Sequence, residues 1–305
     1  MLLKKKGPLL LACNHPNSFL DAAILADLFK EPVYSLARGD VFKKPFYIKL
    51  LRALNILPIY RTSEGVENLN INYHTFDACK EIFKKNGIVL IFSEGQCFNE
   101  WHLRPLKKGT ARLAFRSWNE HIPVEILPVA INYSSFRRFS KNLFINFGEV
   151  MTKNDFDMNE PDGKKNQFFT NKLQQQLQQL VFEIDKTDVE KQRQLLEKKP
   201  SVPAKIFLFI PAIIGWLLNA PLYLPVKNFT YKRANHNDHY DAILIGLLLF
   251  AYPLYVILIT IFIFIPTHSW FSFLTIILMP FTAWAYVQVK PQLDKQSVHK
   301  SFAGN

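Results

Sequence analysis

Short apolar runs alternate with helix-like stretches through the first half of the chain. Each run is rich in Val, Ile or Leu and has the length of one buried strand; the runs cover residues 9–12, 33–37, 56–60, 88–92, 126–132 and 143–147. The clearest helical pattern extends from about Gly65 to Lys85 and stops at Asn86-Gly87, a typical helix end. Strands that alternate with helices predict an α/β fold with a mixed sheet flanked by helices.

The composition of the chain changes twice after this region. Residues 153–200 are polar and rich in Gln, with Leu173 and Leu177 at helical spacing, so we expect one or two amphipathic helices there. Three apolar segments follow, at residues 206–226, 242–266 and 270–289. A C-terminal helical membrane region is therefore predicted after the α/β domain.

The three apolar segments differ in regularity. The second and third contain no charged residue and, at about 20 residues each, are long enough to span a bilayer. Pro211, Gly215 and Pro221 would interrupt a regular helix in the first segment. We expect residues 201–227 to be broken, re-entrant or lying in the membrane interface.

Basic residues predict how the chain is oriented in the membrane. Three precede the second segment and three follow the third: Lys227, Lys232, Arg233, Lys290, Lys295 and Lys300. Because basic flanks favour the cytoplasm, residues 242–289 are expected to form a transmembrane hairpin with its outer turn at 266–269. Residues 1–152, the predicted catalytic domain, would then lie on the cytoplasmic face of the membrane. Three plain spans with the basic tail, residues 290–305, outside are the alternative.

Net charge and cysteine content limit the classes of binding partner that fit the sequence. The formal net charge of +12 fits nucleic acid, an anionic membrane or an anionic substrate. No long basic run or zinc-finger spacing occurs, so anionic membrane lipid is the expected partner and nucleic acid is not. Cys13, Cys79 and Cys97 are an odd number at unrelated spacings, which suggests neither disulfides nor a metal site. The N-terminal apolar stretch is too short for a signal peptide, so the domain is expected to begin almost at once.

Candidate chemistry follows the first predicted strand, in the sequence NHPNSFLDA with His15 and Asp21. A histidine can take a proton from a hydroxyl while a carboxylate fixes its tautomer and stabilises the imidazolium. Residues 18–21 also fit a helix N-cap box, in which Asp21 bonds only a backbone amide. Taken alone, this block leaves both interpretations open.

Three further blocks follow in order: LPIYRTSEG around Arg61, LIFSEG with Glu94 and Gly95, and IPVEILPVAIN around Pro128. Over residues 8–150 this order resembles the glycerol-3-phosphate and 1-acylglycerol-3-phosphate (lysophosphatidate) acyltransferase family. Four ordered blocks are specific, whereas any one of them is weak. The resemblance implies a glycerolipid acyltransferase-like fold and a general-base mechanism at the first block.

The chain departs from the family pattern at two places. Five residues separate His15 from Asp21, where the family has four. Ser93 replaces the usual Pro, and Gln96-Cys97 replaces the usual small residue and arginine. We therefore expect part of the anion binding to fall to other basic residues: Arg104, Lys107 or Lys108.

The remaining site residues have roles that physical chemistry can suggest. Arg61 is the first candidate to grip a phosphate, because a guanidinium binds phosphate oxygens at two points; a plain surface arginine is the alternative. Glu94 would orient the acceptor or the cations, and Gly95 would let the backbone approach a ligand; a simple turn is the alternative. The residues from Lys107 to Gly109 could open an anion-binding helix, or could form a solvated basic turn.

Other polar features are expected to be structural. Pro128 would shape a strand edge. His236 and Asp241 show the family's four-residue gap, but no strand precedes them and no Glu-Gly block follows, so we interpret them as interfacial polar residues. The proposed chemistry requires no metal and no cofactor beyond the acyl donor; His236, His239 and Asp238 could at most hold an adventitious ion.

The sequence thus predicts a membrane-bound O-acyltransferase of phospholipid synthesis. The acyl donor would be acyl-CoA or acyl carrier protein, and the acceptor a hydroxyl of glycerol-3-phosphate or lysophosphatidate. A catalytically inactive lipid-binding membrane scaffold with the same fold is the alternative. A secondary transporter does not fit the few spans and the large soluble part.

Overall fold

The protein is described by a computed structural model that covers residues 2–4, 6–42, 44–59, 69–198, 200–291 and 293. The chain forms two compact units. Unit 1 comprises residues 1–132 and 144–186, and unit 2 comprises residues 133–143 and 187–305.

Unit 1 is built on a mixed sheet of six strands in the order β3-β2-β4-β1-β5-β6. The first five strands in the chain run parallel where their pairing is resolved, and an antiparallel bridge between Ile126 and Met151 lies just beyond β6. The bounds are β1 Leu9–Cys13, β2 Val33–Arg38, β3 Ile56–Ile59, β4 Ile88–Phe92, β5 Glu125–Tyr133 and β6 Leu143–Phe147. Each predicted run forms a strand within one residue of its expected ends, so the predicted mixed sheet is confirmed.

Helices cover the sheet on both faces. The helices of unit 1 are α1 Phe19–Leu28, α2 Pro45–Ala53, α3 Leu69–Lys84, α4 Gly109–Asn119 and α5 Asp162–Leu180. Leu10 and Ala12 point into one core together with residues of α3, α4 and α5, while Leu9 and Leu11 of opposite parity are equally buried. Both faces of β1 are therefore covered, which is why the strand is apolar without alternation.

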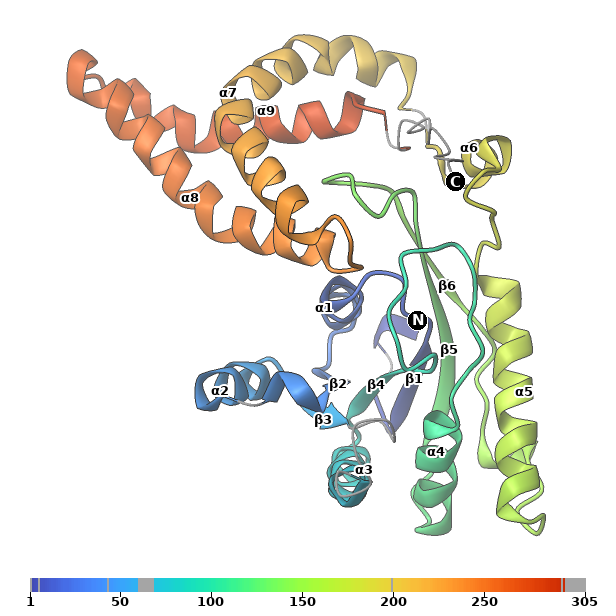
Figure 1. Ribbon diagram of the computed structural model, residues 1–305. Coiled ribbons are helices and arrows are strands. Elements are labelled where there is room, and N and C mark those ends of the chain that lie inside the picture. Colours follow the sequence, from blue (N-terminus) through green and yellow to red (C-terminus); the bar gives the residue numbers. More distant parts are fainter. Residues whose placement is uncertain are drawn as a thin grey trace, which may run out of the picture. The chain divides into compact units, whose positions relative to one another are not determined.

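An aromatic cluster fills the core under α4 and α5, which lie side by side (Figure 1). Phe115 and Trp118 of α4 contact Phe169 of α5, and Phe156 stacks on Trp118. The Trp118 indole N–H donates to the Val124 carbonyl at 2.8 Å, so this large buried ring leaves its one polar group satisfied. The cluster holds α4, and with it the loop before α4, against the sheet.

The parallel register brings the carboxyl ends of neighbouring strands to one edge. Cys13, the last residue of β1, pairs with Phe92, the last residue of β4. The segments that follow both strands therefore emerge together, which is where α/β folds place their ligands.

Pro128 lies inside the sheet, so its predicted place at a strand edge is wrong. It belongs to β5, which lies between β1 and β6, and it pairs with Ala12 of β1. The Pro128 carbonyl accepts from the Gly148 N–H at 2.9 Å, just past the end of β6. Pro128 has no backbone N–H to donate. The sheet tolerates this because β6 has already ended at this level, so a regular strand partner no longer faces Pro128 on that side.

Unit 2 contains α6 Val189–Leu196, α7 Val202–Ala234, α8 Tyr240–Thr267, the short helix η6 Trp270–Leu274 and α9 Thr275–Val289. Residues 202–234, 240–267 and 270–289 are each long and apolar enough to cross a membrane. The structure keeps residues 202–234 in one helix, so the predicted break within residues 201–227 is wrong, whereas their placement in the membrane or its interface stays a prediction. Its interior prolines Pro211, Pro221 and Pro225 accompany a bend that Figure 1 shows within α7.

The three long helices pack closely. A Cβ at Gly215 of α7 would lie 2.0 Å from the Thr282 carbonyl oxygen of α9, so glycine is needed for this contact. Thr260 of α8 and Thr275 of α9 share a hydrogen bond of 2.6 Å near the turn at His268, which adopts a left-handed conformation. Residues 240–289 thus form a helical hairpin that turns at residues 268 and 269.

The tip of the β5–β6 hairpin, residues 133–143, binds one end of this helix bundle. Arg137 donates to the Asn235 carbonyl after α7, and Arg138 to the Pro291 carbonyl after α9. Lys141 forms an ion pair with Asp241 in the first turn of α8. The end of α7, the start of α8 and the end of α9 therefore meet at the hairpin tip, at the bundle end away from His268.

Candidate functional site

His15 and Asp21 form a hydrogen-bonded pair at the carboxyl edge of the sheet. His15 Nδ1 lies 2.9 Å from Asp21 Oδ2, with the Asp21 side chain fully buried and the His15 side chain 18% exposed. Because Asp21 binds Nδ1, the other ring nitrogen, Nε2, is the one that can act as a base. The structure thus brings the two predicted catalytic residues together.

The loop between the two residues accommodates the extra position. Ser18, the residue before α1, has a positive φ of 52°, and its side chain makes no capping hydrogen bond. Asp21 Oδ2 also accepts the Asn17 N–H at 2.8 Å. Asp21 therefore contacts both a backbone amide and the histidine, but the capping box over residues 18–21 is not formed.

Phe92 supports the imidazole from one side. The Phe92 and His15 rings are stacked, with centroids 3.8 Å apart and planes inclined by 14°. The strand register causes this contact, because Phe92 ends β4 beside the end of β1. The sequence analysis missed this contact, although the position of Phe92 at a strand end was visible.

Glu94 ties two loops of the site together. Its Oε2 accepts the His15 N–H and its Oε1 the Arg104 N–H, both at 3.2 Å. Burial raises the pKa of the Glu94 carboxyl from 4.5 to about 7, although the two N–H donors favour the charged form. A carboxyl that titrates near neutrality therefore holds the backbone of the histidine.

Gly95 turns the chain directly after Glu94. Its φ of +68° is strained for any residue with a side chain, and a Cβ there would lie 3.1 Å from Lys107 Cγ. The Lys107 N–H donates to the Ser93 carbonyl at 2.8 Å, and the Ser93 and Thr110 hydroxyls are 3.0 Å apart. Ser93, which replaces the family's usual Pro, thereby anchors the start of α4.

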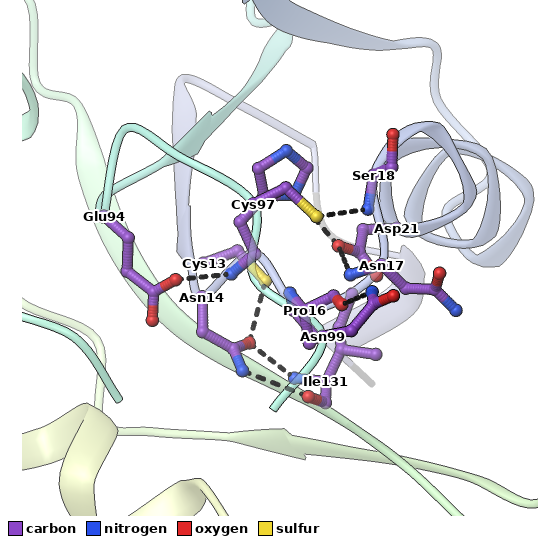
Figure 2. Close-up of polar contacts among 11 residues, drawn as sticks. Cys13, Asn14, Pro16, Asn17, Ser18, Asp21, Glu94, Cys97, Asn99 and Ile131 are labelled. Carbon is purple, nitrogen blue, oxygen red and sulfur yellow. Dashed lines mark hydrogen bonds and ion pairs between the residues drawn. The ribbon is translucent and has the colours of Figure 1, made fainter. Parts of the chain in front are cut away.

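Residues 97–99 bind the loop that carries His15, and Figure 2 shows the contacts of Cys97 and Asn99. The Ser18 N–H donates to Cys97 Sγ at 3.0 Å, the Phe98 N–H to the His15 carbonyl at 3.1 Å, and the Asn99 amide to the Pro16 carbonyl at 2.7 Å. Sequence reasoning did not assign these roles, because nothing local links residues about 80 positions apart.

Asn14 extends the sheet beyond β1 with its side chain. Its Nδ2 donates to the Ile131 carbonyl at 3.1 Å and its Oδ1 accepts the Ile131 N–H at 2.8 Å, as Figure 2 shows. This two-point pairing imitates a strand ladder and fixes the backbone next to His15. Sequence reasoning gave Asn14 no separate role.

Three of the predicted substrate-binding cations, Arg104, Lys107 and Lys108, lie in the described part of the chain. The Arg104 guanidinium binds Glu100, with Nε to Oε1 at 2.5 Å, and lies 3.8 Å from the centre of the Phe98 ring. Lys107 is exposed beside Gly95, and Lys108 is exposed as the residue before α4. Arg61 falls outside the described residues. The substrate-binding roles of these residues stay predictions.

The second His/Asp pair is not a second site. His236 is exposed, whereas Asp241 is buried and ion-paired with Lys141. Asp241 thus pairs with Lys141 within unit 2, and the interpretation of His236 and Asp241 as interfacial residues stays a prediction. Within the described part of the chain, no three His, Cys, Asp or Glu side chains gather as a metal site would require.

Comparison with known proteins finds a similarity in the first part of the chain. Residues 2–132 match a family model described as Acyltransferase. Among solved structures, the chain resembles the crystal structure of the 1-acyl-sn-glycerophosphate acyltransferase PlsC from Thermotoga maritima, with 14% identity and a TM-score of 0.41. That alignment covers 58% of this chain and 68% of the other. No curated protein sequence matches the chain.

Proposed function

We propose that this protein transfers a fatty acyl group from a thioester to a hydroxyl of glycerol-3-phosphate or lysophosphatidate, because residues 2–132 match a family model described as Acyltransferase. The donor would be acyl-CoA or acyl carrier protein. The observation that carries the proposal is the 2.9 Å pair of His15 and Asp21 at the carboxyl edge of the sheet.

The pair suits a general-base mechanism. His15 Nε2 takes the proton of the acceptor hydroxyl while Asp21 holds Nδ1–H and stabilises the imidazolium. The hydroxyl oxygen attacks the thioester carbonyl, a carbon–oxygen bond forms, and the carbon–sulfur bond breaks. The imidazolium returns its proton to the departing thiolate, so the histidine is restored.

The neighbouring residues would position this chemistry. Glu94 holds the N–H of the histidine, Asn14 holds the backbone just before it, and Phe92 fixes the plane of its ring. Arg61, Lys107 and Lys108 are proposed to bind the anionic parts of acceptor or donor, since each lies in or near a block that resembles the family. Arg104 could contribute only if its guanidinium exchanged Glu100 for a ligand.

We propose that the protein is held in the membrane by its apolar helices. The helical hairpin of residues 240–289 and the basic flanks of the segment favour a cytoplasmic location for both ends of that hairpin. A membrane anchor suits an enzyme whose acceptor or product is itself a lipid.

Purified protein in detergent tests the reaction. Labelled acyl-CoA and acyl carrier protein are each offered with glycerol-3-phosphate, lysophosphatidate and other lysolipids, and the lipid products are separated. His15→Ala should lower the rate roughly 10² to 10⁴-fold, while His236→Ala, the matched histidine outside the site, should leave it nearly unchanged. If the wild-type protein binds lipids but transfers no label to any acceptor, the inactive scaffold replaces this proposal.

A further inference from the structure

Exposed apolar side chains of unit 1 gather on one short stretch of the chain. Five large apolar residues are exposed among the described residues of this unit, and Val41, Leu50 and Leu54 are 45%, 46% and 48% exposed within a stretch of 14 residues. Val41 belongs to the short helix η2 Gly39–Phe42, which contacts α2, and Leu50 lies on α2 with Leu54 directly after it. We call residues 39–54 the η2–α2 segment.

The segment combines these apolar groups with positive charge. Residues 38–54 contain five basic residues and one acidic residue. Lys44, Lys49 and Arg52 are exposed there. Leu50 and Leu54 are four positions apart and share one side of the helix. Exposed leucines beside cations are typical of helices that lie in the interface of an anionic membrane.

The strand register places the start of this segment at the edge that carries the site. β2 ends at Arg38, paired with Ile59 of β3, and its Ser35 lies level with Leu90 of β4. Continuing that register puts Arg38 of β2 level with Ser93, the residue after Phe92 of β4, and the end of β1 lies on the far side of β4. The η2–α2 segment therefore begins at the same edge from which His15 emerges. Phe19, 49% exposed in the first turn of α1, adds an apolar group four positions from His15.

We propose that the η2–α2 segment docks on the anionic lipid surface of the membrane, with Leu50 and Leu54 in the interface and the cations at the lipid phosphates. The three apolar helices of the same chain keep a bilayer within reach at all times. A second copy of the chain is a poorer occupant, because it would bring two strongly basic segments together.

Docking would hold the segment that begins at the carboxyl edge of the sheet, the edge that carries His15, on the lipid surface. An acceptor with an acyl chain could then move from the bilayer to His15 without crossing water. This consequence rests on the proposed function, whereas the docking itself does not.

The docking is tested with full-length protein in lipid vesicles. Cys97→Ser removes the partly exposed thiol, while Cys13 and Cys79 are buried. A polarity-sensitive fluorophore is attached at Leu50→Cys, and for comparison at Phe168→Cys on α5, an exposed large apolar residue of unit 1 that lies outside the segment. Vesicles contain phosphatidylcholine alone or mixed with phosphatidylglycerol, with brominated lipid as quencher.

We expect a blue shift and lipid quenching at position 50 and neither at position 168. Both signals should strengthen with phosphatidylglycerol and weaken with salt, because screening shortens electrostatic reach to about 8 Å at physiological ionic strength. Equal signals at the two positions, or none at position 50, overturn the proposal. The proposal is also overturned if the signal depends on the protein-to-lipid ratio but not on lipid charge, because that outcome indicates contact between copies of the protein.

An activity measurement tests the consequence. Leu50→Asp combined with Leu54→Asp should raise the apparent KM for vesicle-borne lysophosphatidate about tenfold or more, because each leucine loses its interfacial burial. The KM for water-soluble glycerol-3-phosphate and the activity of Phe168→Asp should stay near wild type. If no protein transfers acyl groups, the proposed function fails, and the fluorescence at position 50 still decides the docking. An equal loss of activity toward both acceptors argues against the idea that docking delivers lipid acceptors to His15.

Discussion

Replacing Glu94 by Gln should change how the stability of unit 1 depends on pH. Glu94 is 6% exposed, and burial raises the pKa of its carboxyl from 4.5 to about 7. The interval between these values corresponds to roughly 3 kcal/mol. The folded carboxyl binds its proton more tightly than the unfolded one, so in the window from 4.5 to about 7 the folded state holds more protons. Its contribution to stability therefore falls as the pH rises through that window.

The glutamine variant lacks this titration. Wild type should lose up to roughly 3 kcal/mol across the window relative to Glu94→Gln. The variant also carries a fixed cost, because its amide cannot accept both the His15 and the Arg104 N–H; leaving one donor unpaired costs about 1 to 3 kcal/mol at any pH. The wild type should thus have its largest advantage in acid and lose it near pH 8, a value about one unit above the folded pKa.

Buried thiols allow the stability of unit 1 to be followed separately from the helices of unit 2. Cys13 and Cys79 are fully buried in unit 1. In a Cys97→Ser background, a thiol-reactive dye reports their exposure during heating in detergent. Wild type and variant are compared at the same pH, so the ionisation of the thiols cancels. If the difference between the two unfolding temperatures is the same at acid and alkaline pH, the assigned titration of Glu94 is wrong.

Asp21→Asn should lower kcat by about 10⁴ with little change in acceptor KM, because an amide favours the wrong tautomer of His15; steady-state kinetics would show a KM effect instead if the carboxylate served only the backbone. Arg61→Ala should raise the acceptor KM about tenfold to a hundredfold through the loss of a charge-assisted grip. A rise in the donor KM alone would indicate that this arginine binds the acyl donor and not the acceptor. Single cysteines at Ser269 and Asn237, labelled in sealed vesicles, should react from opposite sides; labelling of both from one side would reject the helical hairpin.

The sequence determined the local elements and the identity of the central pair. Strands such as β4 could be predicted because a strand buried on both faces must be apolar at every position. The pair of His15 and Asp21 could be predicted because a histidine, a carboxylate and a turn occur within a few residues of the sequence. These features depend on neighbours along the chain, so no knowledge of the tertiary structure was needed.

Tertiary structure decided which distant groups meet. The contacts of Glu94 with the backbone of His15, of Asn14 with Ile131 and of Asp241 with Lys141 join residues 79, 117 and 100 positions apart. Pro128 could be placed inside the sheet only once the strand order was known. Side-chain polarity shows that a buried group needs a partner, but the partner depends on strand order and helix packing, because those bring together groups that the chain itself keeps apart.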